Sequence, residues 1–310
     1  MEFKISLLNV LLALSYAALG FYLCKVKKAV ADHLPTLSAV LVYLSSPFIV
    51  INAFRSITFS KEGLGQMGLF FLVVLVIQLV FMGLLMLLFR KKQGDVRYRL
   101  AVLASTMGNA GFFGIPIVQV LFPNNPVVMC YACMTICPMN LIAFTLGIYL
   151  MTGKKEAMTP KNAFTNPTML GLLIALPLFV LEWLPKMPEV VVKGVETMAG
   201  ISTPLCMIIL GIRLATVDLK KLFTRPMVYF ACGLKLLVCP LFCFGIVSLF
   251  PIFDATFRGA MLMLAGMPCA SILLNLAEIH QSDTEFAANC VLLSTLLCCV
   301  TIPLLSLLLR

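Results

Sequence analysis

RLAVLASTMGNAGFFGIPIVQVLF, residues 99–122, is the stretch that decides which fold this chain can adopt. It is long and apolar enough for a membrane helix, which needs about 20 residues, yet it holds three glycines and a proline between Gly108 and Pro116. Relative to alanine, each glycine costs a helix about 1 kcal/mol and a proline about 3 kcal/mol, and Pro116 leaves the carbonyl near Phe112 without its donor. In a bilayer, freed backbone groups are tolerated only where protein or a water-filled cavity meets them. The stretch therefore predicts a broken membrane helix.

Composition places the whole chain in the membrane. Apolar residues make up 61% of the 310 positions and charged residues 12%, against roughly 45–50% and about 25% in soluble domains. A soluble protein of this length cannot bury so much apolar surface. The net charge of +10 is spread over short clusters between apolar runs, which is typical of cytoplasmic loops and argues against a nucleic-acid partner.

Ten apolar runs are long enough to cross a bilayer. Because they are continuous instead of alternating at period two, they predict helices and an all-α integral membrane protein without a soluble domain. The first run lacks a small-residue cleavage site and is interpreted as a helix, not a signal peptide. The runs lie at roughly 6–23, 36–54, 67–89, 99–121, 127–150, 166–184, 194–214, 226–250, 256–278 and 285–309.

Lysine and arginine divide unequally between the two sides of these runs. Of the 23 basic residues, 15 fall in the loops after the odd-numbered runs, Arg213 among them, and 7 fall on the opposite side with the termini. Positive charge collects on the cytoplasmic side. The count predicts a plasma-membrane protein with both termini outside the cytoplasm. The remaining residue, Lys235, lies inside the eighth run.

Several motifs recur about 157 residues apart, which indicates an internal repeat. Ser-Ser-Pro at 45–47 matches Ser-Thr-Pro at 202–204, and each motif is followed by an arginine, Arg55 or Arg213.

Two further features repeat at a similar distance. Gln78 in the third run corresponds to Lys235 in the eighth, and the break at 108–116 corresponds to one at 266–268. We expect two five-helix units, 1–151 and 166–310, joined by a cytoplasmic linker at 152–165. Five is odd, so the second unit must be inverted in the membrane, an arrangement typical of secondary transporters.

The two breaks are the candidate binding site. Crossing at mid-depth, they would expose helix N-termini, which attract anions. Asn109 lies inside the first break, and Ser271 and Asn275 follow the second. Two alternatives stay open: the breaks are proline kinks closed by Ser and Thr side chains, and the Asn109 amide bonds loosened backbone instead of a ligand.

Lys235 is the basic residue at the centre of a run, where a charge needs a partner or water. It serves as a counter-ion for an anionic substrate, as a substitute for a bound cation, or as a packing residue that reaches toward the membrane surface. No aspartate or glutamate lies mid-run, which argues against a carboxylate proton relay. The twelve cysteines lie in or beside apolar runs and are interpreted as packing residues, so no metal or other cofactor is expected.

GNAGFFGIPIVQVLF at 108–122 resembles the fourth-helix signature of the auxin efflux carrier family, in which an Asn and a Gly-x-Pro surround a crossover. Asn140 with Thr-Leu-Gly at 145–147 resembles the fifth helix of that family. The C-terminal stretch is similar to its ninth and tenth helices, through Met267-Pro268, Leu-Ala-Glu at 276–278, Ser-Thr-Leu at 294–296 and Thr-Ile-Pro-Leu at 301–304. The resemblance covers the whole chain.

This resemblance implies ten helices in two inverted five-helix repeats, with broken crossover helices 4 and 9, in a superfamily that includes the bile-acid sodium symporters. Helices 1, 2, 6 and 7 would form a scaffold, often a homodimer through helices 2 and 7, and the others a mobile, elevator-like transport domain. The short linker after helix 5 is similar to that of prokaryotic malate and malonate permeases. Pro268-Cys269-Ala270-Ser271 departs from many relatives, which have a second proline there.

The sequence thus predicts a secondary transporter of small organic anions, mono- or dicarboxylates, coupled to Na+, H+ or exchange. A channel or exchanger for another small solute, a sodium-coupled bile-acid-type symporter and a sensor are the alternatives. An enzyme is not expected, because no intramembrane nucleophile or acid–base pair is evident. The expected binding residues are Asn109, Gly111, Pro116, Asn140, Pro268, Ser271 and Asn275, with Lys235 and Gln78 balancing charge or coupling an ion.

Overall fold

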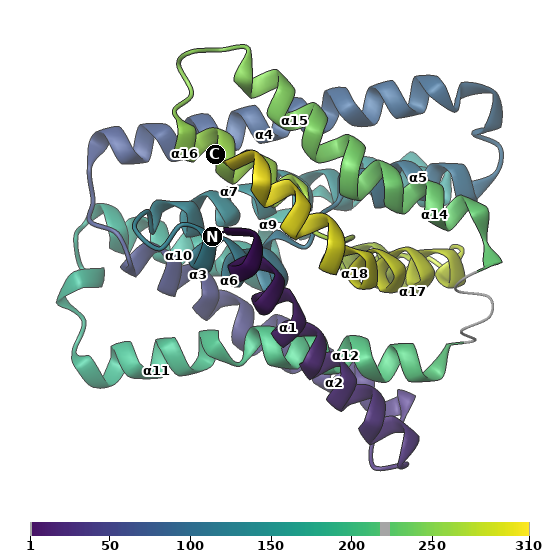
Figure 1. Ribbon diagram of the computed structural model, residues 1–310, viewed down its shortest axis with the longest axis horizontal. Helices are drawn as coiled ribbons and strands as arrows, with labels where there is room; N and C mark the ends of the chain where they lie inside the picture. The colour runs from purple at the N-terminus through teal and green to yellow at the C-terminus, as the bar shows by residue number, and fades with distance from the viewer. Residues whose placement is uncertain (1, 218–223, 310) are drawn as a thin grey trace.

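The computed structural model describes residues 2–217 and 224–309, and every regular element within these ranges is helical (Figure 1). The helices of the first half are α1 (Glu2–Lys25), α2 (Leu34–Ala39), α3 (Ser46–Arg55), α4 (Lys61–Leu88), α5 (Val96–Thr106), α6 (Ile115–Leu121), α7 (Val127–Ile142), α8 (Ile148–Thr152) and α9 (Pro160–Thr165). Those of the second half are α10 (Pro167–Val180), α11 (Glu189–Gly200), α12 (Ser202–Thr216), α14 (Pro226–Gly233), α15 (Cys239–Ser248), α16 (Ala255–Ala265), α17 (Ile272–Ile279) and α18 (Thr284–Ser306).

Wider π-helical turns join several of these helices into longer rods. They lie at Val40–Ser45, Ala110–Gly114, Ala143–Gly147 and Leu234–Val238. Tighter 3-10 turns lie at Ala31–His33, Arg90–Lys92, Lys155–Ala157, Leu184–Lys186 and Leu307–Leu309. The polar linker expected at 152–165 is therefore partly helical, and its Thr159 N–H donates to the Phe144 carbonyl at 2.9 Å.

Among the described residues, seven helical segments are long and apolar enough to cross a membrane, and an eighth is formed by Lys155–Thr165 and Pro167–Val180 with a bend of 41°. An all-helical chain with many apolar crossings is thus confirmed for this part. The two other expected runs, 99–121 and 256–278, are each divided into shorter helices. The divisions fall at the predicted breaks, between α5 and α6 and between α16 and α17.

We call α1, α2–α3, α10 and α11–α12 the frame helices. Within this group α1 packs along α12, and α3 packs against α10 and α11. A Cβ atom on Gly211 would lie 1.9 Å from the Ala17 carbonyl oxygen, and one on Gly20 would lie 2.2 Å from that of Ile208. Membrane helices approach this closely only where small residues let their backbones meet. The frame is therefore held by direct backbone contact between α1 and α12.

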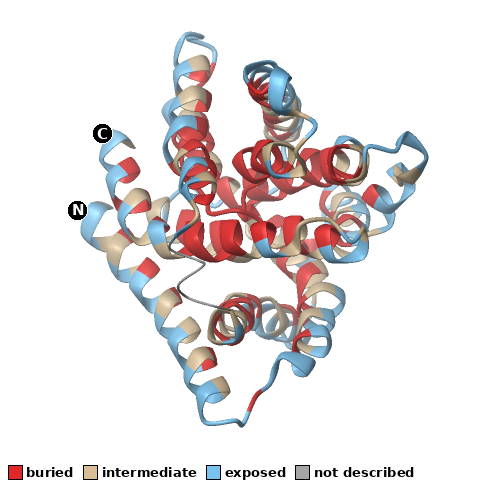
Figure 2. Cartoon of the chain, turned by 90° about the vertical axis from the view of Figure 1, so that its right-hand side faces the viewer, coloured by how far each residue is buried: buried red, intermediate tan, exposed pale blue. Residues whose placement is uncertain are grey.

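We call α4–α8 and α14–α18 the crossover body. In the most apolar 18-residue window of its span Val127–Thr152, 83% of the residues are buried, against 17% in that of α1. Figure 2 shows the buried residues gathered in the middle of the molecule and the exposed ones on the outer helices. Leu12 and Leu19 of α1 and Leu72 and Val76 of α4 are large exposed apolar side chains, which suits lipid contact.

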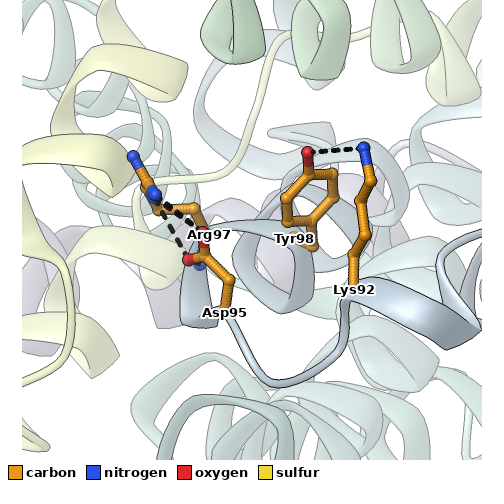
Figure 3. Close-up of polar contacts among 4 residues, drawn as sticks. All are labelled: Lys92, Asp95, Arg97 and Tyr98. Carbon is orange, nitrogen blue, oxygen red and sulfur yellow. Dashed lines mark hydrogen bonds and ion pairs between the residues drawn. The ribbon is translucent and has the colours of Figure 1, made fainter.

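The connection between α4 and α5 fixes the start of the helix that leads to the first break (Figure 3). The Asp95 carboxylate accepts from the Arg97 backbone N–H at 2.9 Å and pairs with the Arg97 guanidinium at 2.7 Å. These bonds from Arg97 lower the pKa of Asp95. The Lys92 ammonium donates to the Tyr98 hydroxyl at 3.1 Å. Asp95 thereby caps α5, a stabilising position for a carboxylate.

Replacing Gly211 by alanine should destabilise the frame, because the new methyl group would collide with the Ala17 backbone. Overpacking of this kind costs about 1–3 kcal/mol. Gly245→Ala is the matched control, since a Cβ there meets no atom within 4 Å. We expect the thermal unfolding midpoint in detergent to fall for Gly211→Ala and not to fall for Gly245→Ala. Equal midpoints for the two variants would contradict the close approach of α1 and α12.

Candidate functional site

The two breaks meet and hydrogen bond to each other. Gly108 and Cys269 form an isolated antiparallel bridge. The Asn109 N–H donates to the Pro268 carbonyl at 2.8 Å, and the Ala270 N–H donates to the Met107 carbonyl at 3.1 Å. Each break therefore supplies partners for backbone groups that the other leaves without a helical bond. The two breaks therefore cross, as the glycines and prolines predicted. We call this contact of residues 107–109 with residues 268–270 the crossing.

Side-chain hydroxyls of neighbouring helices form hydrogen bonds with other backbone groups near the crossing. The Phe112 carbonyl, which Pro116 deprives of a helical donor, accepts from the Thr203 hydroxyl of α12 at 2.9 Å. The Cys269 N–H donates to the Ser294 hydroxyl of α18 at 2.9 Å. The alternative of kinks closed by Ser and Thr side chains is thus correct in part, because hydroxyls close both breaks while the breaks also cross.

A cavity of about 250 Å³ lies beside the crossing. The cavity is lined by residues of the crossover body and by residues of the frame helices α2–α3 and α12. Five of the residues expected to bind a solute line it from α7, α17 and the two breaks. They are Asn109, Gly111, Asn140, Ser271 and Asn275.

Two amides in this cavity, those of Asn109 and Asn140, lack strong partners within the protein. Asn109 and Asn140 are only 6% and 5% exposed. The Asn109 amide nitrogen reaches only the Cys206 sulfur, at 4.0 Å, and the Asn140 side chain makes no hydrogen bond to any described residue. Buried polar groups in native proteins are nearly always paired. These amides are therefore placed to bind polar groups of a solute in the cavity.

The two prolines act on the backbone and do not line the cavity. Pro116 lies in the first turn of α6, where it cannot donate to Phe112. Pro268 contributes its carbonyl to the crossing. Both were expected among the binding residues, and the structure places both just outside the cavity wall.

Lys235 and Gln78, which occupy matched positions of the repeat, line one separate cavity of about 20 Å³. Lys235 is 1% exposed, and its ammonium donates to the Ala265 carbonyl at 2.6 Å. Ala265 ends α16, so the ammonium lies at the negative end of a helix dipole. The ammonium lies beside the crossing, since a Cβ atom on Gly108 would be 2.9 Å from its nitrogen. It does not line the main cavity.

Arg213 is the main cavity residue that was not predicted as a binding residue. It was expected at the end of a helix and counted among the cytoplasmic charges, and it lies in the last turn of α12, where it lines the cavity. Cys206, Ile209 and Leu210 line the cavity from the same helix, at spacings that share one helix face. That periodicity was the available signal. Other polar lining residues not anticipated are Ser38, Ser46, Asn166 and Thr168.

In the part of the chain that the structure describes, no cluster of three or more His, Cys, Asp or Glu side chains could hold a metal ion. The twelve cysteines are free thiols, ten of them buried.

Known proteins resemble this chain over most of its length. The family described as membrane transport protein matches residues 5–306. An uncharacterized transporter of Methanocaldococcus jannaschii is 24% identical over 272 residues, which cover 85% of this chain and 86% of that protein. An uncharacterized transporter of Methanothermobacter thermautotrophicus is 29% identical over 206 residues, which cover 65% of each. The family match therefore includes both breaks and both halves of the chain.

Replacing Lys235 by methionine should destabilise the protein, because the Ala265 carbonyl would lose its charged donor inside the membrane. Leaving a buried acceptor unpaired costs about 1–3 kcal/mol. Lys193→Met, at an exposed position of α11, is the control. We expect the unfolding midpoint in detergent to fall for Lys235→Met alone, and an unchanged midpoint would show that the ammonium does not stabilise the crossing.

Proposed function

The chain belongs to the membrane transport protein family, the auxin efflux carrier family that its broken-helix motif resembles, and we propose that it is a secondary carrier of small organic anions. The substrate class is mono- or dicarboxylates of the size of malate or malonate. Substrate binds at the crossing, between the crossover body and the frame helices.

The cavity beside the crossing carries this proposal. Its polar lining consists of amides, hydroxyls and one guanidinium, and no acidic side chain is found among its described lining residues. Amide N–H groups and an arginine are donors that suit carboxylate oxygens. A volume of about 250 Å³ lies just below the range of drug-sized ligand sites, about 300–1,000 Å³. Both the chemistry and the size favour a small anion.

Asn109 and Asn140 would bind the carboxylate, and Ser271 and Asn275 would complete the site from α17. Gly111 would let the solute approach the backbone of the first break. Pro116 and Pro268 would keep the breaks open without touching substrate. Lys235, with Gln78 beside it, would supply the fixed positive charge that balances the helix ends at the crossing.

Ten spans in two inverted five-helix repeats are the architecture that best accommodates these observations. Ser45 and Ser202, 157 residues apart, lie with their hydroxyl oxygens at 2.5 Å. Gln78 and Lys235, the next matched pair, share one cavity. Matched residues meet in this way when two units are related by an axis running between them. The broken spans, α5–α6 and α16–α17, would be the fourth and ninth.

Motion of the crossover body against the frame helices would give an elevator-type cycle. The glycine contacts of α1 with α12 support a rigid frame, and the mutual hydrogen bonds of the two breaks support a body that moves as a unit. The family resemblance further supports a homodimer through the second and seventh spans, α2–α3 and α11–α12. Placement in the plasma membrane with both termini outside the cytoplasm follows from the distribution of basic residues.

Uptake into proteoliposomes tests the function. Labelled carboxylates would be offered while sodium, pH and membrane potential are set independently. We expect saturable uptake of at least one acid. Loading the vesicles with the same acid should accelerate this uptake, because a carrier returns faster to the outward-facing state when substrate is bound. Uptake that stays linear and is not accelerated would indicate a channel. A strict sodium requirement would favour the bile-acid-type symporter, and a pH-gradient requirement would favour proton coupling.

Asn109→Ala should impair this uptake by removing a donor from the binding site, raising KM about tenfold, the scale of one hydrogen bond to a charged group. Asn125→Ala, at an exposed position, is the control. Both proteins would first be shown to elute normally on gel filtration in detergent. Unchanged uptake by well-folded Asn109→Ala would count against carboxylate binding at the crossing.

A further inference from the structure

Arg213 stands at the junction of two cavities. It lines the main cavity beside the crossing and also a wider recess of about 690 Å³ next to it. Ser38, Val42, Asn275 and Ile279 line both spaces as well. The recess continues to Ala31, Leu34 and Thr216, close in the chain to the basic residues that end and follow α1. The Arg213 side chain is therefore a charged group that a solute in either space can contact.

Arg213 is also the single charged side chain among the described residues that line the main cavity. Its Nη1 atom donates to the Glu278 carboxylate at 2.9 Å. Glu278 lines the recess but not the main cavity. Asn275, one turn earlier on α17, lines both. The guanidinium therefore lies between a protein carboxylate on one side and the solute cavity on the other.

The matched arginine of the first repeat unit is paired differently. Arg55, 158 residues earlier, forms an ion pair with Glu196 of α11, inside the frame, and it does not line the main cavity. By the same spacing, the counterpart of Glu196 on α2 is Ser38 or Ala39, and neither is acidic. Arg213 thus lacks the frame carboxylate that neutralises Arg55. Its partner instead comes from α17 of the crossover body.

The pair with Glu278 has the properties of an exchangeable contact. The Glu278 side chain is 46% exposed and that of Arg213 is 18% exposed. Ion pairs of this exposure are weak and screened by salt. A guanidinium binds any carboxylate through the same fork of N–H donors, so a solute carboxylate can replace Glu278 without loss of bonding.

We propose that Arg213 is a carboxylate-binding residue at the mouth of the cavity, and that Glu278 is an internal competitor which the solute displaces. The inference rests on the proposed function and assigns it a further binding residue. Displacement also releases the ionic link between α12 of the frame and α17 of the crossover body. Binding of the anion thereby frees the crossover body to move against the frame helices.

A purely structural ion pair is the rival explanation, and a charge reversal separates the two. In the double variant Arg213→Glu with Glu278→Arg, the link between α12 and α17 is restored but the cavity faces a carboxylate. A structural role requires that the double variant recover the activity lost in Arg213→Gln. A binding role requires that it stay inactive, because the carboxylate at position 213 repels the anion.

The experiment measures carboxylate uptake into proteoliposomes and, on the same proteins in detergent, the rise of the unfolding midpoint with added malonate. For Arg213→Gln we expect KM to rise at least about tenfold and the malonate stabilisation to vanish. For Glu278→Gln, which keeps Arg213 and removes its competitor, we expect KM to fall about two- to fivefold, the range of an exposed ion pair. Arg55→Gln is the matched control and should leave KM unchanged.

Recovery of uptake in the charge-reversed variant would overturn the proposal, and so would an unchanged or higher KM in Glu278→Gln. Glu278→Gln tests the proposal even if Arg213→Gln does not fold. If the wild type transports no carboxylate, the proposed function fails. The detergent measurement still tests Arg213 in that case, and absence of malonate stabilisation in the wild type would overturn the inference as well.

Discussion

The constraint on which the rest of this structure depends is the need to pair backbone groups inside a membrane. Two helices break in mid-course at glycines and prolines, and hydrocarbon offers no water to the groups that are freed. The breaks solve this by bonding to each other, Asn109 to Pro268 and Ala270 to Met107. Once these bonds are made, α5 and α16 must end face to face, and the helices around them must enclose the meeting point.

The enclosure brings polar side chains into the interior at two places. On the side of the frame helices, Asn109 and Asn140 face a cavity without strong partners of their own. In the separate small cavity, the Lys235 ammonium binds the last carbonyl of α16. Beside it, the buried Gln78 side-chain oxygen has no hydrogen-bond partner among the described residues. Both places therefore hold polar groups that the protein leaves unpaired, but only the first adjoins a cavity of about 250 Å³.

Contact between the frame and the crossover body is of a different kind from contact within either group. Within the frame, Gly20 and Gly211 bring backbones together, which leaves no freedom to slide. Between the groups, α1 packs against α6 and α18, α3 packs against α7, and single polar bonds such as Thr203 to Phe112 and Arg213 to Glu278 also cross the boundary. Bonds of this kind can be exchanged one at a time. This boundary is where the proposed motion would take place.

The sequence by itself determined the membrane environment, the helical class, the two breaks and the family, because each depends on residues close together in the chain. Apolar run length and the glycine–proline cluster are local properties, and they drew attention to Asn109, Gly111, Asn140, Ser271 and Asn275, which line one cavity. Only the tertiary structure decided that Arg213 lines the cavity, that Pro116 and Pro268 lie outside it, and that Lys235 has a protein partner. These outcomes depend on how helices from different parts of the chain pack against one another, and hydropathy does not encode that packing.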